Sequence, residues 1–157
     1  MMKLRTNAFD LWVFQRDPNA VRYLLLYTSQ EKADKWFNGG RFWQIPGGVF
    51  GEDEPVVEAL SRVLRTYQLM PRALWAVEHV STIYNRRHQA LELIPVFAAE
   101  VGDVAAIPLT WEHAEYRWLT AEECRDRLTF RGLVEGLEWT RAYITEPAAP
   151  RAEFRLA

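Results

Sequence analysis

The sequence predicts an α+β domain in which a mixed β-sheet is layered against helices. Two pairs of apolar runs, at residues 9–15 with 21–27 and at 72–84 with 89–101, are each joined by a short polar segment typical of a hairpin turn. A segment with helical periodicity lies between the pairs, and further helical patterns follow the last strand. Strands joined mainly by hairpins favour this class over a regular alternation of strands and helices.

Length and composition indicate one globular domain. The chain has 157 residues, 49% of them hydrophobic, and its 19 basic and 21 acidic residues give a net charge of −2. This balance lacks the basic excess of a nucleic-acid binder or a membrane-surface protein, so we expect neither partner. We place one domain at residues 1–146 and a tail without a clear element, expected to be mobile, at 147–157.

The cysteine count and the hydropathy pattern indicate a compartment. Cys124 is the single cysteine and cannot form an intrachain disulfide, which is usual under reducing conditions. No apolar run approaches the ~20 residues of a membrane span. We therefore expect a cytoplasmic protein.

A long loop and a glycine turn are predicted between the first hairpin and the helix. Residues 28–41 are mostly polar, which favours a surface loop that borders a binding site. A short strand-like run at 42–45 leads into Pro46-Gly47-Gly48, where glycine permits a sharp turn and a close approach of two backbones.

The helix expected at residues 55–68 is the clearest local element. Pro55 suits its first turn, and Asp53 and Glu54 place negative charge at the positive end of the helix dipole. Pro71 follows its end. Apolar residues recur along one side at spacings of three and four: Val56, Leu60, Val63 and Tyr67.

The last third of the chain predicts a strand and two helices. The strand is expected at residues 115–119, and Thr120 with Glu123 has the capping-box pattern for a helix that reaches about residue 128. Leu133, Leu137 and Tyr143 fall on one side of a final helix.

One constellation carries most of the functional information. Gly48 and Glu54 are six residues apart, Arg62 follows eight residues later, and Leu64 and Met70 are aliphatic at the next fixed offsets. This pattern resembles the signature of the Nudix hydrolases. Residues 112–119, followed by a helix, look like the late strand of the branch that contains dATP and dihydroneopterin triphosphate pyrophosphohydrolases.

The resemblance implies a fold, an activity and a set of site residues. It implies an α/β/α sandwich around a mixed sheet, hydrolysis of a nucleoside diphosphate linked to another group, as in a nucleotide pyrophosphatase, and magnesium or manganese as cofactor. With it we assign Glu54, Arg62 and Glu112 as candidate catalytic residues and Glu54 as candidate metal ligand. The candidate substrate-binding residues are Trp43, Gln44, Gly47, Gly48, Arg86 and Arg87.

The sequence departs from the signature where the metal is held. Val63, Thr66 and Tyr67 occupy the three positions at which the family carries its box glutamates, and Leu69 replaces the glycine. Mg²⁺ requires hard carboxylate oxygens, which these side chains lack. Glu58 does not substitute, because at about 100° per residue it points about 140° away from Val63. The sequence therefore predicts a degenerate Nudix box, and catalytic activity is left open.

Several of these residues also have a purely structural interpretation. Val63 and Tyr67 fit a core stripe, Arg62 fits an ion pair with Glu58 four residues earlier, and Gly47 and Gly48 fit a simple turn. The aromatic residues before the glycines fit either a nucleobase-stacking surface or a small core that pins the loop: Trp36, Phe37, Phe42 and Trp43.

Two functions follow. The first is a Nudix hydrolase acting on a nucleoside di- or triphosphate-type substrate, weakened or inactivated by the box replacements. The second is a non-catalytic Nudix-fold module that binds a nucleotide-like small molecule or a protein partner. Both functions are compatible with a homodimer.

Overall fold

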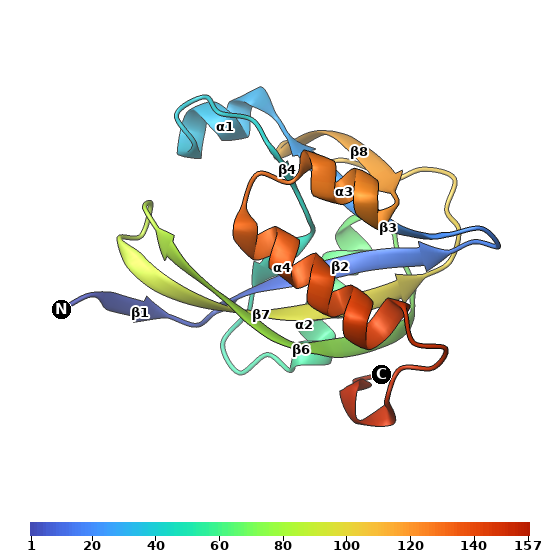
Figure 1. The fold of residues 1–157 in the computed structure, drawn as a ribbon. Helices are drawn as coiled ribbons and strands as arrows, with labels where there is room; N and C mark the ends of the chain where they lie inside the picture. Colours follow the sequence, from blue (N-terminus) through green and yellow to red (C-terminus); the bar gives the residue numbers. More distant parts are fainter.

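A computed structural model describes residues 1–157 and has four α-helices and eight strands (Figure 1). The strands are β1 (Lys3–Arg5), β2 (Ala8–Arg16), β3 (Val21–Thr28), β4 (Trp43–Gln44), β5 (Gly47–Val49), β6 (Pro71–Asn85), β7 (Ala90–Val101) and β8 (His113–Leu119). The helices are α1 (Gln30–Trp36), α2 (Val56–Thr66), α3 (Ala121–Arg127) and α4 (Arg131–Thr140), which continues into a π-helical turn at Arg141–Thr145. A 3₁₀ turn follows at Ala152–Phe154.

All eight strands belong to one mixed sheet. Its main path runs β1-β7-β2-β3-β4, while β6 pairs with β7, β5 with β2, and β8 with β3. The β1–β7 and β2–β7 pairs are parallel and the others antiparallel. The two predicted hairpins are β2–β3 and β6–β7, so the expected α+β class with a mixed sheet is confirmed.

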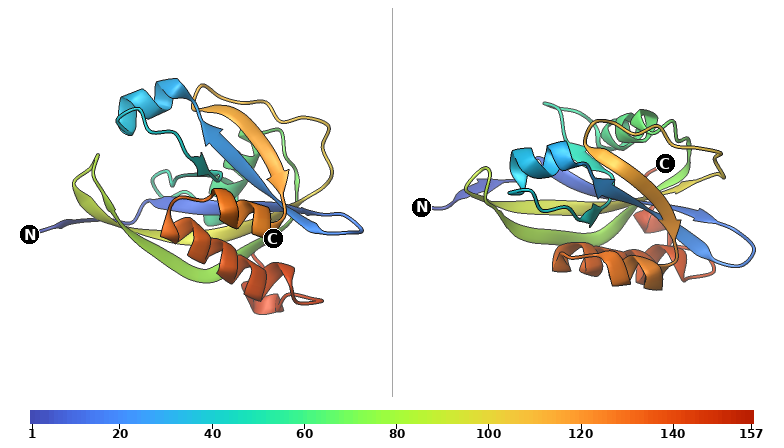
Figure 2. Two further views of the ribbon diagram at one scale, coloured as in Figure 1. Left: turned by 45° about the horizontal axis from the view of Figure 1, so that its top comes forward. Right: turned by 90° about the horizontal axis from the view of Figure 1, so that it is seen from above.

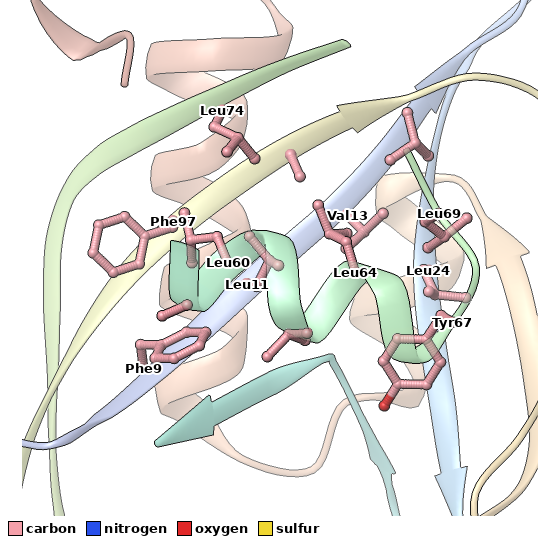
Figure 3. Close-up of a cluster of buried hydrophobic side chains, with 14 of the residues drawn as sticks. Phe9, Leu11, Val13, Leu24, Leu60, Leu64, Tyr67, Leu69, Leu74 and Phe97 are labelled. Atoms are coloured by element: carbon pink, nitrogen blue, oxygen red, sulfur yellow. The ribbon is translucent and has the colours of Figure 1, made fainter. Parts of the chain in front are cut away.

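Helices cover both faces of the sheet, which gives the α/β/α sandwich that the resemblance implied (Figures 1 and 2). Alternate residues of β2 point to opposite faces: Leu11 and Val13 pack under α2, and Trp12 and Phe14 pack under α3 and α4. We call these two buried clusters the α2-side core and the α4-side core. Helix α2 lies across the sheet on the first of them (Figure 3).

Residues 28–41 differ from the predicted loop, because α1 occupies seven of them. The Ser29 side chain accepts the Lys32 N–H at 3.0 Å and caps the helix, and Gln30 donates to Asp34 Oδ1 at 2.8 Å. Only Lys32 and Ala33 are buried. A helix this short does not show a periodic apolar stripe, so the polar run resembled a loop.

The predicted glycine turn is also wrong in form. Gly47 and Gly48 lie in β5, opposite Asp10 and Phe9 of β2, and neither has a positive φ. The close backbone approach is confirmed, since a Cβ at Gly47 would lie 2.6 Å from the Phe9 carbonyl oxygen. The glycines therefore serve packing and not a turn.

The segment at residues 147–157, expected as a tail, lies against β6. Leu74 donates its N–H to the Ala157 carbonyl at 2.9 Å and accepts the Leu156 N–H at 2.8 Å. The Arg155 guanidinium lies over the Trp75 ring, 5.5 Å from its centroid. These contacts occupy part of the outer edge of β6.

None of the helices is both long enough and apolar enough to cross a membrane.

Candidate functional site

The loop before α2 is tied to the helix by Glu54 and Arg62. Arg62 donates from Nε and Nη2 to the two carboxylate oxygens of Glu54, both at 2.9 Å, and from Nη2 to the Val49 carbonyl at 2.9 Å. The Gly51 N–H donates to Glu54 Oε2 at 2.8 Å. These bonds hold the pKa of Glu54 down at about 2, chiefly through Arg62 and then through Gly51. Arg62 thus pairs with Glu54 and not with Glu58.

The end of α2 is a well-formed stop. The Leu69 N–H donates to the Leu64 carbonyl and the Gln68 N–H to the Arg65 carbonyl, both at 3.0 Å, which is the Schellman pattern. Gln68 takes the left-handed position, with φ of 54°. The left-handed residue is therefore Gln68. It lies one position before the glycine position of the signature, which Leu69 occupies.

Two of the three signature glutamate positions are packed in the α2-side core. Val63 is 7% and Tyr67 6% exposed, which confirms their interpretation as a core stripe. Thr66 is exposed and donates its hydroxyl to the Arg62 carbonyl at 3.3 Å. Tyr67 stands at the end of α2 with its hydroxyl oxygen at the margin of the cluster (Figure 3).

These side chains do not fit a magnesium site of the kind that the resemblance implies. The Glu54 oxygens already accept three hydrogen bonds, Glu115 pairs with Arg117 at 2.7 Å, and Glu112 pairs with Lys32 at 3.2 Å. No group of three His, Cys, Asp or Glu side chains is placed so that it could hold a metal ion. Thr66 alone adds one neutral oxygen.

The candidate substrate residues do not form a single surface. Trp43 and Gln44 are neighbours on β4 and point to opposite faces of the sheet. Trp43 packs on Tyr27 beside the α4-side core, with ring centroids 4.9 Å apart. Gln44 faces the α2 side, where its Oε1 lies 2.8 Å from His113 Nε2.

Arg86 and Arg87 are exposed at the β6–β7 hairpin tip. The Arg87 guanidinium stacks on the Trp36 ring of α1, 4.3 Å from its centroid, and Trp36 packs against Trp111 at 5.5 Å. The aromatic residues before the glycines therefore do not form one group, because Phe42 packs between Phe37 and Phe130, with ring centroids 4.8 Å and 4.7 Å away.

The backbone is similar to several solved structures. A proposed Nudix hydrolase from Listeria monocytogenes superposes with a TM-score of 0.74 at 14% identity, covering 94% of this chain and 99% of the other. The chain has the Nudix fold. The dihydroneopterin triphosphate pyrophosphohydrolase of Escherichia coli gives a TM-score of 0.65 at 17% identity, covering 94% of this chain and 100% of that one.

A third similar structure contains a ligand. The Nudix domain of NrtR from Shewanella oneidensis, complexed with ADP ribose, gives a TM-score of 0.68 at 18% identity and covers 92% of this chain and 90% of that one. No protein-family model and no curated protein matches the sequence.

Within this Nudix fold, one polar cluster escaped the sequence analysis. Lys32 is buried and donates to Gln44 Oε1 at 2.7 Å, while His113, also buried, shares the same acceptor. Lys32 lies in the segment at residues 28–41 that was expected to be a surface loop. Only His113, within Glu112-His113-Ala114-Glu115, gave a signal.

Asp10 was also not predicted as a site residue. It lies on β2 opposite Gly47, and burial raises its pKa from 3.8 to about 7. A titrating group with a strongly shifted pKa is a candidate functional residue. The signal was present in the sequence, because Asp10 interrupts the apolar run of residues 9–14.

Proposed function

We propose that this chain is a Nudix-fold module that binds a nucleoside-diphosphate-type ligand without a metal ion held by α2. This proposal rests on a contrast between the ion pair that ties the preceding loop to α2 and the buried side chains at two of the signature's glutamate positions. The ion pair of Glu54 and Arg62 keeps the frame in place, whereas Val63 and Tyr67 are packed in the core. The ion pair between two signature residues is present, but side chains without carboxylate oxygens occupy the three glutamate positions. This combination favours ligand binding over metal-assisted hydrolysis.

The choice of ligand rests on the fold and on two side chains. The Nudix domain of NrtR, similar in backbone, is complexed with ADP ribose. In this chain Trp36 supplies a half-buried aromatic ring, and Arg87, whose guanidinium lies 4.3 Å from the centroid of that ring, supplies an exposed cation. An aromatic ring and a cation suit a planar base and a phosphate.

The test is a thermal-shift measurement of the purified protein with ADP, ADP ribose and dATP, each with EDTA and with Mg²⁺. We expect a nucleotide to raise Tm in EDTA, because a ligand that binds only the native state stabilises it. A nucleotide that raises Tm only with Mg²⁺ would contradict the proposal. ADP ribose, dNTPs and dinucleoside polyphosphates incubated with Mg²⁺ or Mn²⁺ should remain intact.

The hydrolase reading is the rival outcome of the same experiment. Metal-dependent turnover that Glu112→Gln abolishes and Glu58→Gln leaves unchanged would establish it and would overturn the binding module. Glu58 suits as control because it is exposed and makes no ion pair.

The proposal extends to partners and location. A near-neutral chain with a net charge of −2 suits a small-molecule ligand better than nucleic acid or a membrane surface, and the single buried cysteine suits the cytoplasm. Size-exclusion chromatography with light scattering distinguishes a monomer from a homodimer.

A further inference from the structure

A buried ammonium group lies on the α2 side of the sheet. The side chain of Lys32 is 9% exposed, and its Nζ donates to Gln44 Oε1 at 2.7 Å and lies 3.2 Å from Glu112 Oε1. Burial lowers the pKa of Lys32, while Glu112 opposes that change. A buried charge is unfavourable unless it is paired and hydrogen-bonded, so a charge kept here calls for a reason beyond stability.

The neighbouring histidine leaves an acceptor unfilled. An ammonium can only donate, so Gln44 Oε1 is an acceptor, and His113 Nε2, 2.8 Å from the same oxygen, must donate to it. His113 Nδ1 then carries the lone pair, and it is buried without a hydrogen-bond partner. Burial, and secondarily Lys32, lowers the pKa of His113 to about 4, so the ring is neutral at pH 7.

The cluster lies close to the end of α2. Burial raises the pKa of Tyr67 to about 12, and the negative charge of Glu112 adds to this effect. Glu112 is therefore near the last of the three signature positions. The protein thus places a fixed cation of its own on the side of the sheet where the resemblance implies a metal cation.

The two members of the ion pair differ in their freedom to move. Glu112 is 37% exposed at its side chain, whereas Lys32 is held by α1, by Gln44 and by its own burial. Glu112 can turn into solvent, and Lys32 cannot. The ammonium also has three N–H donors, of which Gln44 and Glu112 use two.

We propose that Lys32 is the phosphate-binding group of this protein and that Glu112 is an internal counter-ion which the phosphate displaces. This assignment rests on the proposed function and names the group that contacts the diphosphate. A phosphate oxygen takes the place of the Glu112 carboxylate on Nζ, where partial burial strengthens the attraction.

The test measures binding of inorganic pyrophosphate in EDTA by titration calorimetry. We expect the wild type to bind, and Lys32→Met, which keeps most of the side-chain volume, to weaken binding by at least ~10-fold, the loss of one charged hydrogen bond. Lys35→Met is the matched control, since Lys35 is exposed on the same helix, and it should change the affinity by less than about twofold.

The direction in which Glu112→Gln changes the affinity for pyrophosphate is decisive. Removing the internal counter-ion should tighten pyrophosphate binding, whereas a merely structural ion pair would make both Lys32→Met and Glu112→Gln bind less. Circular dichroism checks that each variant folds, and Glu112→Gln still tests the proposal if Lys32→Met does not. Absence of pyrophosphate binding by the wild type, equal binding by Lys32→Met, or weaker binding by Glu112→Gln would each overturn it.

The two proposals fail in different ways. If ADP binds in EDTA and pyrophosphate binding is indifferent to Lys32, the nucleotide-binding function stands and the Lys32 site is wrong. If nucleotides bind only with Mg²⁺ while pyrophosphate in EDTA depends on Lys32, the metal-free function is wrong and the Lys32 site stands.

Discussion

Glu54 and Arg62 meet in a two-point ion pair that fastens the loop to α2, and this pair gives the molecule a measurable pH dependence. The folded pKa of Glu54, about 2, lies below its ordinary value of 4.5. The pair therefore contributes stability above pH 4.5, which is lost as pH falls towards 2. The contribution is modest because Arg62 is largely exposed.

We expect Glu54→Gln to lower Tm at pH 7 and the difference from wild type to shrink steadily below about pH 4.5. Thermal unfolding at half-unit intervals between pH 7 and pH 3 measures it. Glu58→Gln is the control on the same segment and should show no such trend. A Glu54→Gln deficit that is independent of pH would contradict the ion-pair account.

Asp10 predicts the opposite dependence. Its folded pKa, about 7, lies above its ordinary value of 3.8 because of burial, so the wild type loses stability as pH rises from about 4 through 7. Asp10→Asn removes the charge and should be more stable than wild type at pH 8, by up to about 4 kcal/mol, and similar at pH 4. Urea unfolding at the two pH values measures this.

The matched control is Asp17→Asn in the β2–β3 turn. The backbone N–H groups of Asn19 and Ala20, and then Arg22, lower the pKa of Asp17, so its replacement should destabilise at pH 8. A shift of the same sign in both variants would show that loss of an acidic charge, and not the burial of Asp10, is being measured.

At the scale of elements, the glycines of β5 set how closely this strand approaches β2. A Cβ at Gly47 would lie 2.6 Å from a backbone oxygen of Phe9, whereas one at Gly48 would lie 3.1 Å from side-chain atoms of Phe9 and Val63. Side chains can shift and backbone cannot without disturbing the strand pair. The two glycines therefore differ in what they tolerate.

We expect Gly47→Ala to destabilise by about 2–3 kcal/mol and Gly48→Ala by about 1 kcal/mol, since overpacking ranges over these values. Denaturant unfolding of both variants measures the difference. Equal losses, or a larger loss for Gly48→Ala, would show that β5 moves away from β2 as a unit.

The elements that were predicted correctly from the sequence are mainly those long enough to show an apolar periodicity. The two hairpins and α2 have enough residues for their apolar periodicity to be visible, and the capping box at Thr120 and Glu123 is present as expected. Helix α1 and strand β5 are short and exist because of what they touch: Lys32 reaches Gln44, and Gly47 fits against Phe9. Contacts between distant segments leave little trace in a local pattern.

The same limit applies to the candidate site. The spacing placed Glu54 and Arg62 together correctly, but only the geometry shows that they form an ion pair with each other. Their catalytic and metal-binding roles stay predictions. Lys32, Gln44 and Glu112 are separated by up to eighty residues, so no motif could join them. The half-buried Asp10, in contrast, was visible in the sequence as an acid within an apolar strand.

At the scale of the molecule, β6 has a long outer edge, and exposed strand edges invite pairing with other chains. The last residues cover part of it through the bonds of Leu74 with Leu156 and Ala157, and Phe154 packs on Tyr143 with ring centroids 5.3 Å apart. The segment at residues 147–157, which was expected to be mobile, thus joins β6 to the π-helical turn after α4.

Deleting residues 155–157 should speed hydrogen exchange at the Leu74 amide and lower the free energy of unfolding by about 1–2 kcal/mol, the range for one or two backbone hydrogen bonds. Exchange at the Trp12 amide, in the central strand β2, should keep its protection relative to global unfolding. Arg155→Ala separates the backbone pairing from the stacking on Trp75, because it keeps the bonds to Leu74. Rapid exchange of the Leu74 amide already in the full chain would instead favour a mobile tail, since an undocked segment cannot shield the strand edge.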